Sequence, residues 1–160
     1  NYTATMSNFV VRDFGVKGKV DLADISTSGE GEPVTLEILN GSTVVHTSTV
    51  TLDANGRFAL ANPVAAGTYN VALKGTTHLR KLITGVTFTA TTAVVNATLI
   101  NGDVDGDNEV GPGDFGLLAT AFLSVNGDPN WNANADLDRD GEVGPGDFGI
   151  LASNFLASGD

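Results

Sequence analysis

Two acidic segments carry the side chains best suited to chemistry in this chain. One segment reads DVDGDNEVGPGDFG (residues 103–116), and the other reads DLDRDGEVGPGDFG (residues 136–149), 33 residues later. Aspartate occupies positions one, three, five and twelve of both: Asp103, Asp105, Asp107 and Asp114, then Asp136, Asp138, Asp140 and Asp147. Carboxylates this close repel one another unless a cation neutralises them. The spacing therefore predicts a metal site in each segment.

The ligand types indicate which metal to expect. Ca²⁺ binds about six to eight oxygen atoms at about 2.3–2.6 Å, and an EF-hand-type loop supplies them from alternate side chains, the backbone carbonyl at position seven and the carboxylate at position twelve. Position seven is Glu109 in the first segment and Glu142 in the second. A solvated acidic loop is the alternative for a single segment. Two matched copies favour two calcium sites.

A short helix is expected after each loop. The segments are GPGDFGLLATAFL (residues 111–123) and GPGDFGILASNFL (residues 144–156), and each has proline where a first helical turn tolerates it. Apolar side chains recur at i, i+3 and i+7 in both: Phe115, Leu118 and Phe122, then Phe148, Leu151 and Phe155. This periodicity predicts that the two stripes face each other in a small core, with Trp131 packed over it.

The first hundred residues read as β structure. Short runs rich in Thr and Val, separated by turn signals such as Asn40-Gly41 and Asn55-Gly56, predict strands near 15–22, 34–39, 43–52, 57–60, 67–73, 79–83, 86–89 and 93–99. We therefore expect a mainly β chain with a small α part: an antiparallel Ig-like β-sandwich over residues 14–100, then a calcium-binding module over residues 101–160. Residues 1–13 are β-capable and predict an edge strand or a strand donated to a neighbour.

The charge distribution excludes some partners. The chain has 160 residues and a net charge of −11. Residues 1–100 contain seven acidic and seven basic side chains, whereas residues 101–160 contain twelve acidic side chains and Arg139 as their only basic one. Nucleic acid and anionic membranes are therefore poor partners, and no apolar run approaches the length of a membrane span. Weak calcium sites are common outside cells, so we expect an extracellular protein. Sequons at Asn1, Asn40 and Asn96 carry little weight.

Two parts of the sequence resemble known families. Pro33-Val34-x-Leu36, TLDANGRFAL (residues 51–60) and AAGTYNVAL (residues 65–73) make residues 14–100 similar to carboxypeptidase regulatory-like, or transthyretin-like, sandwich domains. That resemblance implies a structural or binding module. Residues 101–156 resemble a type I dockerin, with two loop-helix repeats of the F-hand type. The dockerin resemblance implies two Ca²⁺ ions, held by the eight aspartates and the carbonyls of Glu109 and Glu142, and a cohesin partner in a polysaccharide-degrading assembly.

The chain departs from the dockerin pattern at two places. Position six of the first loop is Asn108, where Gly is usual, and Asn tolerates the left-handed backbone required there. Positions ten and eleven, which the resemblance implies are read by a cohesin, are Pro112-Gly113 and Pro145-Gly146. These residues offer a partner few side-chain groups.

Catalysis has few candidate residues. His46 and His78 lie in β-patterned segments without a neighbouring nucleophile or acid that would form a catalytic arrangement. A carbohydrate site would need exposed aromatic platforms, and Tyr2, Tyr69 and Trp131 are few for that purpose. The sequence therefore predicts a protein without enzymatic activity.

Three functional hypotheses remain. The first is a secreted structural protein that associates with its own copies, head to tail, into a filament or surface layer. The basic stretch Lys74, His78, Arg80 and Lys81 would then meet the acidic end of a neighbour, although a solvated loop is its simpler interpretation. The alternative is a module that docks a cohesin-like domain of a polysaccharide-degrading complex. In the third hypothesis the calcium module only caps its own sandwich.

Overall fold

The computed structural model describes residues 15–61, 63–89 and 91–160. Within them the chain is mainly β with two short helices. The strands are β1 (Val16–Leu22), β2 (Pro33–Asn40), β3 (Thr43–Thr51), β4 (Arg57–Leu60), β5 (Gly67–Gly75), β6 (Lys81–Phe88) and β7 (Ala93–Leu99), and the helices are α1 (Pro112–Ala121) and α2 (Pro145–Ser153). None of the described helices is long and apolar enough to cross a membrane. The predicted strand over residues 1–13 lies outside the described residues.

The strands form two sheets, with the orders β4-β1-β7 and β3-β2-β5-β6. All five neighbouring pairs are expected to be antiparallel in a sandwich of hairpins, but β1 and β7 pair in parallel from Val16↔Ala93 to Leu22↔Leu99. The prediction of a wholly antiparallel sandwich is therefore wrong at this pair. Its two strands are the first and last of the sandwich, so no local turn fixes their relative direction.

Strand β6 replaces two predicted strands, 79–83 and 86–89. The pairing of β5 with β6 shifts register between Tyr69 and Val71. Opposite the shift, Gly85 has a φ of 72°, and its N–H donates to Asn70 Oδ1 at 3.2 Å. A β-bulge absorbs one extra residue in this way without ending the strand. Gly85 lies between the two predicted strands, and in the structure it forms part of a bulge within one continuous strand.

A first hydrophobic cluster fills the space between the sheets. In β2 the buried side chains of Val34, Leu36 and Ile38 alternate with more exposed ones, as the period of two in a half-buried strand requires. Side chains from β1, β5 and β7 complete this core with Leu52, Phe58 and Phe88. Apolar burial of this extent is the main source of stability in a sandwich.

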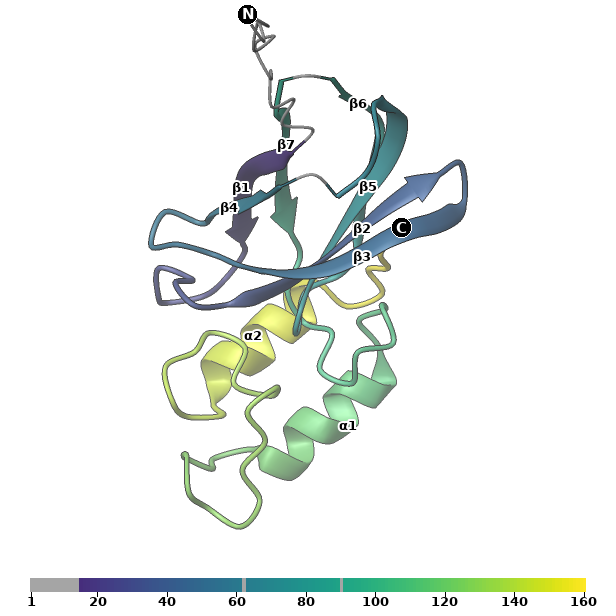
Figure 1. Ribbon diagram of the computed structural model, residues 1–160. Helices are drawn as coiled ribbons and strands as arrows, with labels where there is room; N and C mark the ends of the chain where they lie inside the picture. The colour runs from purple at the N-terminus through teal and green to yellow at the C-terminus, as the bar shows by residue number, and fades with distance from the viewer. Residues whose placement is uncertain (1–14, 62, 90) are drawn as a thin grey trace, which may run out of the picture.

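A second hydrophobic cluster lies below the sandwich, around α1 and α2 (Figure 1). Leu118 and Leu151 are buried in it, and Trp131 packs against it as predicted. Phe115 and Phe148, however, are each 46% exposed. The prediction that all three positions of each stripe form the core is wrong, because only the central leucine of each stripe is buried. The phenylalanines form an outer face.

The two clusters are joined without a flexible linker. Asn101 is fully buried between them. Its side-chain amide donates to the carbonyl oxygens of Leu137 (2.8 Å) and Ala23 (3.3 Å), and its Oδ1 accepts from the Thr77 hydroxyl at 2.9 Å. Leu79, which precedes β6, belongs to the second cluster. The loop-helix module, residues 101–160, is thus held against the sandwich by buried polar and apolar contacts.

Candidate functional site

The fold brings together three carboxylates in each acidic loop. In the first loop, Asp103, Asp105 and Asp114 each place one oxygen within 4.8 Å of the other two. Asp136, Asp138 and Asp147 do the same in the second loop. Oxygen donors at this spacing match the chemistry of a hard divalent cation such as Ca²⁺. Positions one, three and twelve of each predicted site therefore meet at one point.

Each helix fixes the carboxylate at position twelve. Asp114 lies in the first turn of α1, where its Oδ2 accepts from the Gly111 N–H at 2.6 Å and its Oδ1 accepts from the Val104 N–H at 2.6 Å. Asp147 repeats both bonds in α2: Oδ2 accepts from the Gly144 N–H at 2.7 Å and Oδ1 from the Leu137 N–H at 2.6 Å. A carboxylate is favoured at a helix N-terminus by the local N–H groups. The duplicated sequence therefore produces duplicated geometry.

The remaining predicted ligands lie outside the two three-carboxylate clusters. Asp107 Oδ1 accepts from the Glu109 N–H at 2.9 Å, and Asp140 Oδ1 accepts from the Glu142 N–H at 2.9 Å. Glu109 forms an isolated β-bridge with Ser158, and Glu142 forms one with Val125. These bridges tie position seven of each loop to a segment outside that loop. The roles of these four residues as ligands stay predictions.

The backbone at position six is left-handed in both loops. Asn108 has a φ of 74°, and Gly141 has a φ of 93°. Asn108 Oδ1 also accepts from the Arg80 N–H at 2.7 Å. The substitution of Asn for the usual Gly therefore preserves the turn and adds a contact with the sandwich.

Crowding perturbs the carboxyl groups. The pKa of Asp136 is raised mainly by burial, against the hydrogen bond from Gly141, and further by the charge of Asp147. Burial and the charge of Asp147 likewise raise the pKa of Asp138. The hydrogen bond from Asp107 lowers the pKa of Asp105, but burial and the neighbouring aspartates outweigh it and leave this pKa raised. Such sites favour a bound cation over bare carboxylates.

One oxygen in the first cluster has no partner among the described residues. Asp103 is fully buried, and its Oδ1 accepts no hydrogen bond from that part of the chain. An ionised oxygen in that environment is costly unless something neutralises it. The donor set and this oxygen fit a calcium ion.

The basic stretch contacts its own chain. The Lys74 ammonium pairs with Asp103 Oδ2. The Arg80 guanidinium pairs with Glu37 at 2.9 Å, and Lys81 Nζ lies 3.5 Å from Asp160. His78 is buried and pairs with Asn101 in an isolated bridge. Lys74 and Lys81 therefore join the sandwich to the loop-helix module, and Arg80 pairs within the sandwich, so these three charges are partly offset inside the chain. Of the three, Lys81 stays the most exposed, at 57% of its side chain.

The second loop reaches the sandwich through other groups. The Ser26 N–H donates to the Asp138 carbonyl at 2.7 Å, and the Arg139 guanidinium donates to Glu32 at 3.3 Å. Sequence reasoning missed all of these contacts. Each joins residues far apart in the chain, and no local pattern marks such a pair.

The Pro-Gly positions lie against the carboxylates. A Cβ atom built on Gly113 would overlap Asp105 Oδ2, and one on Gly146 would overlap Asp138 Oδ2. Both aspartates are members of the clusters. Position eleven therefore has no room for a recognition side chain while position three keeps its conformation.

The helices carry an exposed apolar face instead. Phe115 and Phe148 pack edge to face with ring centroids 6.3 Å apart. With Leu118, Ala119 and Phe122 they line an open groove of about 350 Å³. Large exposed apolar patches on soluble proteins commonly mark interaction sites. This groove, which we call the helix face, begins at the residue directly after Asp114.

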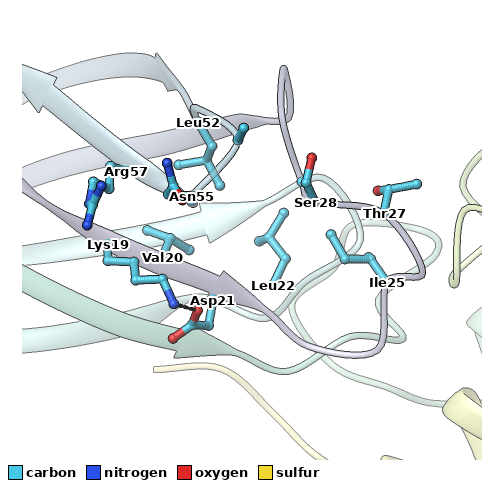
Figure 2. Close-up of a pocket in the computed structure, with 13 residues that line it drawn as sticks. Lys19, Val20, Asp21, Leu22, Ile25, Thr27, Ser28, Leu52, Asn55 and Arg57 are labelled. Carbon is cyan, nitrogen blue, oxygen red and sulfur yellow. Dashed lines mark hydrogen bonds and ion pairs between the residues drawn. The ribbon is translucent and has the colours of Figure 1, made fainter.

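A second hollow, of about 380 Å³, lies on the sandwich between the end of β1 and the turn before β4 (Figure 2). Leu22, Ile25 and Leu52 line it, and the Lys19–Asp21 ion pair lies at its side. None of its lining residues belongs to either carboxylate cluster. It has no arrangement of nucleophile and base among those residues.

Comparison with known proteins supports a role in protein interaction. Residues 101–156 match the model of the Dockerin type I domain. Two solved structures are similar to almost the whole chain: a C-terminal interface mutant and an N-terminal interface mutant of a type II Cohesin-X-Dockerin complex from Acetivibrio cellulolyticus. A search of curated proteins found no match.

The structural similarity extends beyond the matched domain. The chains in the two complexes are 26% and 25% identical to this one, with TM-scores of 0.72 and 0.71. In each case the alignment covers 90% of this chain and 96% of the other. It therefore includes the sandwich as well as the loop-helix module. The chain is similar over nearly its full length to a component of a cohesin-dockerin complex, and its residues 101–156 carry the dockerin pattern.

Proposed function

We propose that this chain is a secreted, non-catalytic docking protein whose dockerin-like module binds a cohesin-like domain in a calcium-dependent manner. It comprises an Ig-like sandwich of the carboxypeptidase regulatory-like type (residues 14–100) and a pair of F-hand repeats (residues 101–160). The observation that carries the proposal is the coupling of each carboxylate cluster to a helix whose first turns bear an exposed phenylalanine. Bound calcium would fix the two helices and hence the helix face.

Two calcium ions are proposed, one in each loop. The first would be held by Asp103, Asp105, Asp107, the Glu109 carbonyl and Asp114, and the second by Asp136, Asp138, Asp140, the Glu142 carbonyl and Asp147. The matched geometry of Asp114 and Asp147 supports equal roles at position twelve. Metal binding then supplies folding free energy to a module with a small core.

The helix face is the proposed contact surface. The Pro-Gly positions present only a proline ring and no hydrogen-bonding side chain, whereas Phe115, Phe122 and Phe148 are all more than one third exposed. Aromatic side chains are enriched among residues that dominate binding energy. We therefore propose that the partner presents a complementary apolar patch and reads these rings in place of loop positions ten and eleven.

Association between copies of the chain is the second candidate. An exposed apolar groove also suits a second copy, although the filament predicted from the sequence relied on the basic stretch and a donated N-terminal strand. The internal ion pairs of Lys74, Arg80 and Lys81 count against the electrostatic form of that idea. The full-length similarity to a component of a Cohesin-X-Dockerin complex favours the cohesin-like partner.

Calorimetric titration with a type II cohesin domain tests the proposal. We expect binding in calcium, none in excess chelator, and at least about tenfold weaker binding for Phe148→Ser, since loss of an aromatic hot-spot residue costs about 2 kcal/mol or more. The matched control is Val94→Ser, on β7, because Val94 is 62% exposed but lies outside the helix face. Equal weakening by both variants would contradict the assigned surface. Calcium-dependent oligomers without cohesin binding would favour self-association.

A further inference from the structure

The carboxylates at position one of the two loops have different partners. Asp103 Oδ2 accepts from the Lys74 ammonium and from the Asn108 N–H at 3.2 Å. In the second loop, Asp136 accepts only backbone N–H groups within the described residues, from Asp140 at 3.2 Å and Gly141 at 3.1 Å. Two loops with the same ligand pattern thus differ by one positive charge.

The second loop has a cation of its own, but it points elsewhere. The Arg139 guanidinium reaches Glu32 Oε2 at 3.3 Å and the Ala133 carbonyl at 3.4 Å. Neither acceptor belongs to the cluster of three carboxylates. Arg139 therefore offsets the charge of the sandwich and not that of its own loop.

Lys74 is held firmly beside the first loop. It lies in β5, an inner strand of the four-stranded sheet, and its side chain is only 25% exposed. Its ammonium also donates to the His78 carbonyl at 3.3 Å. Because the stem and the head group are both fixed by the sandwich, the ammonium cannot move far from Asp103 without breaking these contacts.

We infer that Lys74 is a positioning residue that makes the two calcium sites unequal, so that the second loop fills before the first. The inference rests on the proposed calcium binding. Asp103 would bind the ion through Oδ1, the oxygen without a partner among the described residues. Lys74 is bonded to the other oxygen of the same carboxylate, so an ammonium and a divalent cation share one ligand. Their repulsion in a partly buried site weakens calcium binding, and the ammonium already neutralises Asp103.

The sandwich thereby regulates the first loop. Asp136 has no comparable cation among its described partners, so calcium binding to the second loop releases more free energy than binding to the first. As the calcium concentration rises, the α2 half of the module orders first, and the α1 half follows.

Two backbone amides can follow the sites separately. Asn108 and Gly141 occupy position six of their loops, and each donates its N–H to the carboxylate at position one. Two-dimensional NMR of the full chain in buffered calcium would follow the signal of each amide and give the calcium concentration at which half of its change has occurred, its midpoint. We expect the Gly141 midpoint at a calcium concentration at least about tenfold below that of Asn108.

Variants at Lys74 test the cause. Lys74→Met should lower the Asn108 midpoint about tenfold and move the Gly141 midpoint less than about twofold, since only the first loop loses a neighbouring charge. Lys74→Gln keeps a hydrogen-bond donor without the charge, should behave in the same way, and gives the answer if the methionine variant misfolds. Lys81→Met is the matched control: it removes one positive charge from β6 whose ion-pair partner is Asp160 and not a loop carboxylate, and should move both midpoints less than about twofold.

Each outcome decides the inference. Equal midpoints in the unaltered chain would overturn it, as would an Asn108 midpoint that rises or stays fixed in both Lys74 variants. A chain whose amides do not respond to calcium at all would overturn the proposed metal sites as well. A calcium response that is equal in the two loops would leave the metal sites standing and refute only the role of Lys74.

Discussion

The sandwich and the loop-helix module of this chain are stabilised by different means. Fourteen buried apolar side chains form the sandwich cluster, thirteen from the seven strands and Leu52 from the turn after β3. Nine form the module cluster, and one of those nine, Leu79, comes from the sandwich segment. The module's helices have ten and nine residues, and helices this short are unstable alone. An apolar core can therefore stabilise the sandwich by itself, whereas the module relies on contacts from the sandwich and, under the proposed function, on bound calcium.

Removal of calcium should separate the two regions most sharply. We expect chelator to abolish the cooperative unfolding transition of the module and to leave that of the sandwich, because several carboxylates of each loop would then be crowded without a counter-ion. Differential scanning calorimetry with helical circular dichroism would measure this. Identical melting curves with and without chelator would show that the module depends on calcium no more than the sandwich does.

Truncation of Leu79 should show the dependence of the module on the sandwich. Leu79→Ala is expected to destabilise the module by about 2–5 kcal/mol, since it leaves a cavity among buried side chains. Leu73→Ala makes the same chemical change in the sandwich cluster and should lower mainly the sandwich transition. Urea unfolding in saturating calcium would measure both. If Leu79→Ala affected only the sandwich transition, the module would not depend on this side chain.

Acid should weaken the contacts around His78, which lies between the sandwich and the loop-helix module. Burial lowers the pKa of His78 to about 4, although the hydrogen bond with the Ala23 carbonyl opposes the shift. In the unfolded chain the His78 ring is protonated below about pH 6.5, whereas in the folded chain it is protonated only below about pH 4. The contribution of His78 to the unfolding free energy is therefore complete above about pH 6.5 and is lost as the pH falls from about 6.5 to 4. The loss amounts to about 3 kcal/mol. Unfolding free energies measured across this range would show the slope.

A histidine variant isolates that contribution. His78→Gln removes the titrating ring, so its stability should vary less with pH between 6.5 and 4 than that of the unaltered chain. If both proteins lost stability in parallel, the pH dependence of the unfolding free energy would come from the loop carboxylates and not from His78.

Two glycine substitutions should have the smallest effects, with opposite signs. Gly85→Ala forces a φ of 72° on a residue with a side chain, so the sandwich should lose about 1–2 kcal/mol. Gly116→Ala lies inside α1 with open space around its Cβ, and the module should gain about 0.5–1 kcal/mol. Separate calorimetric transitions would report both. Shifts of the same transition in both variants would show that the regions unfold as one unit.

Local features of the fold could be predicted from the sequence. The carboxylate spacing from Asp103 to Asp114 sets the loop, and Pro112 and Pro145 begin the helices where the structure has them. Alternation in β2 correctly indicates its buried face. Each of these features is decided within about a dozen neighbouring residues.

Features decided by distant residues could not be predicted. The periodicity of Phe115 and Leu118 marks a stripe but does not show which of its positions a partner helix covers. The pairing of Lys74 with Asp103 joins residues 29 positions apart. The parallel pairing of β1 with β7 also depends on how the whole sandwich closes, and no residue in either strand specifies it.

That parallel pair has a mechanical consequence. The chain enters the sandwich through β1 and leaves toward the loop-helix module from β7, and the two strands are hydrogen-bonded in register over seven residue pairs. Tension applied between the start of β1 and the end of β7 would pull the strands along their length in opposite directions. All hydrogen bonds of the pair would then bear the load together, and the sandwich would resist stretching far better than a hairpin that opens one bond at a time.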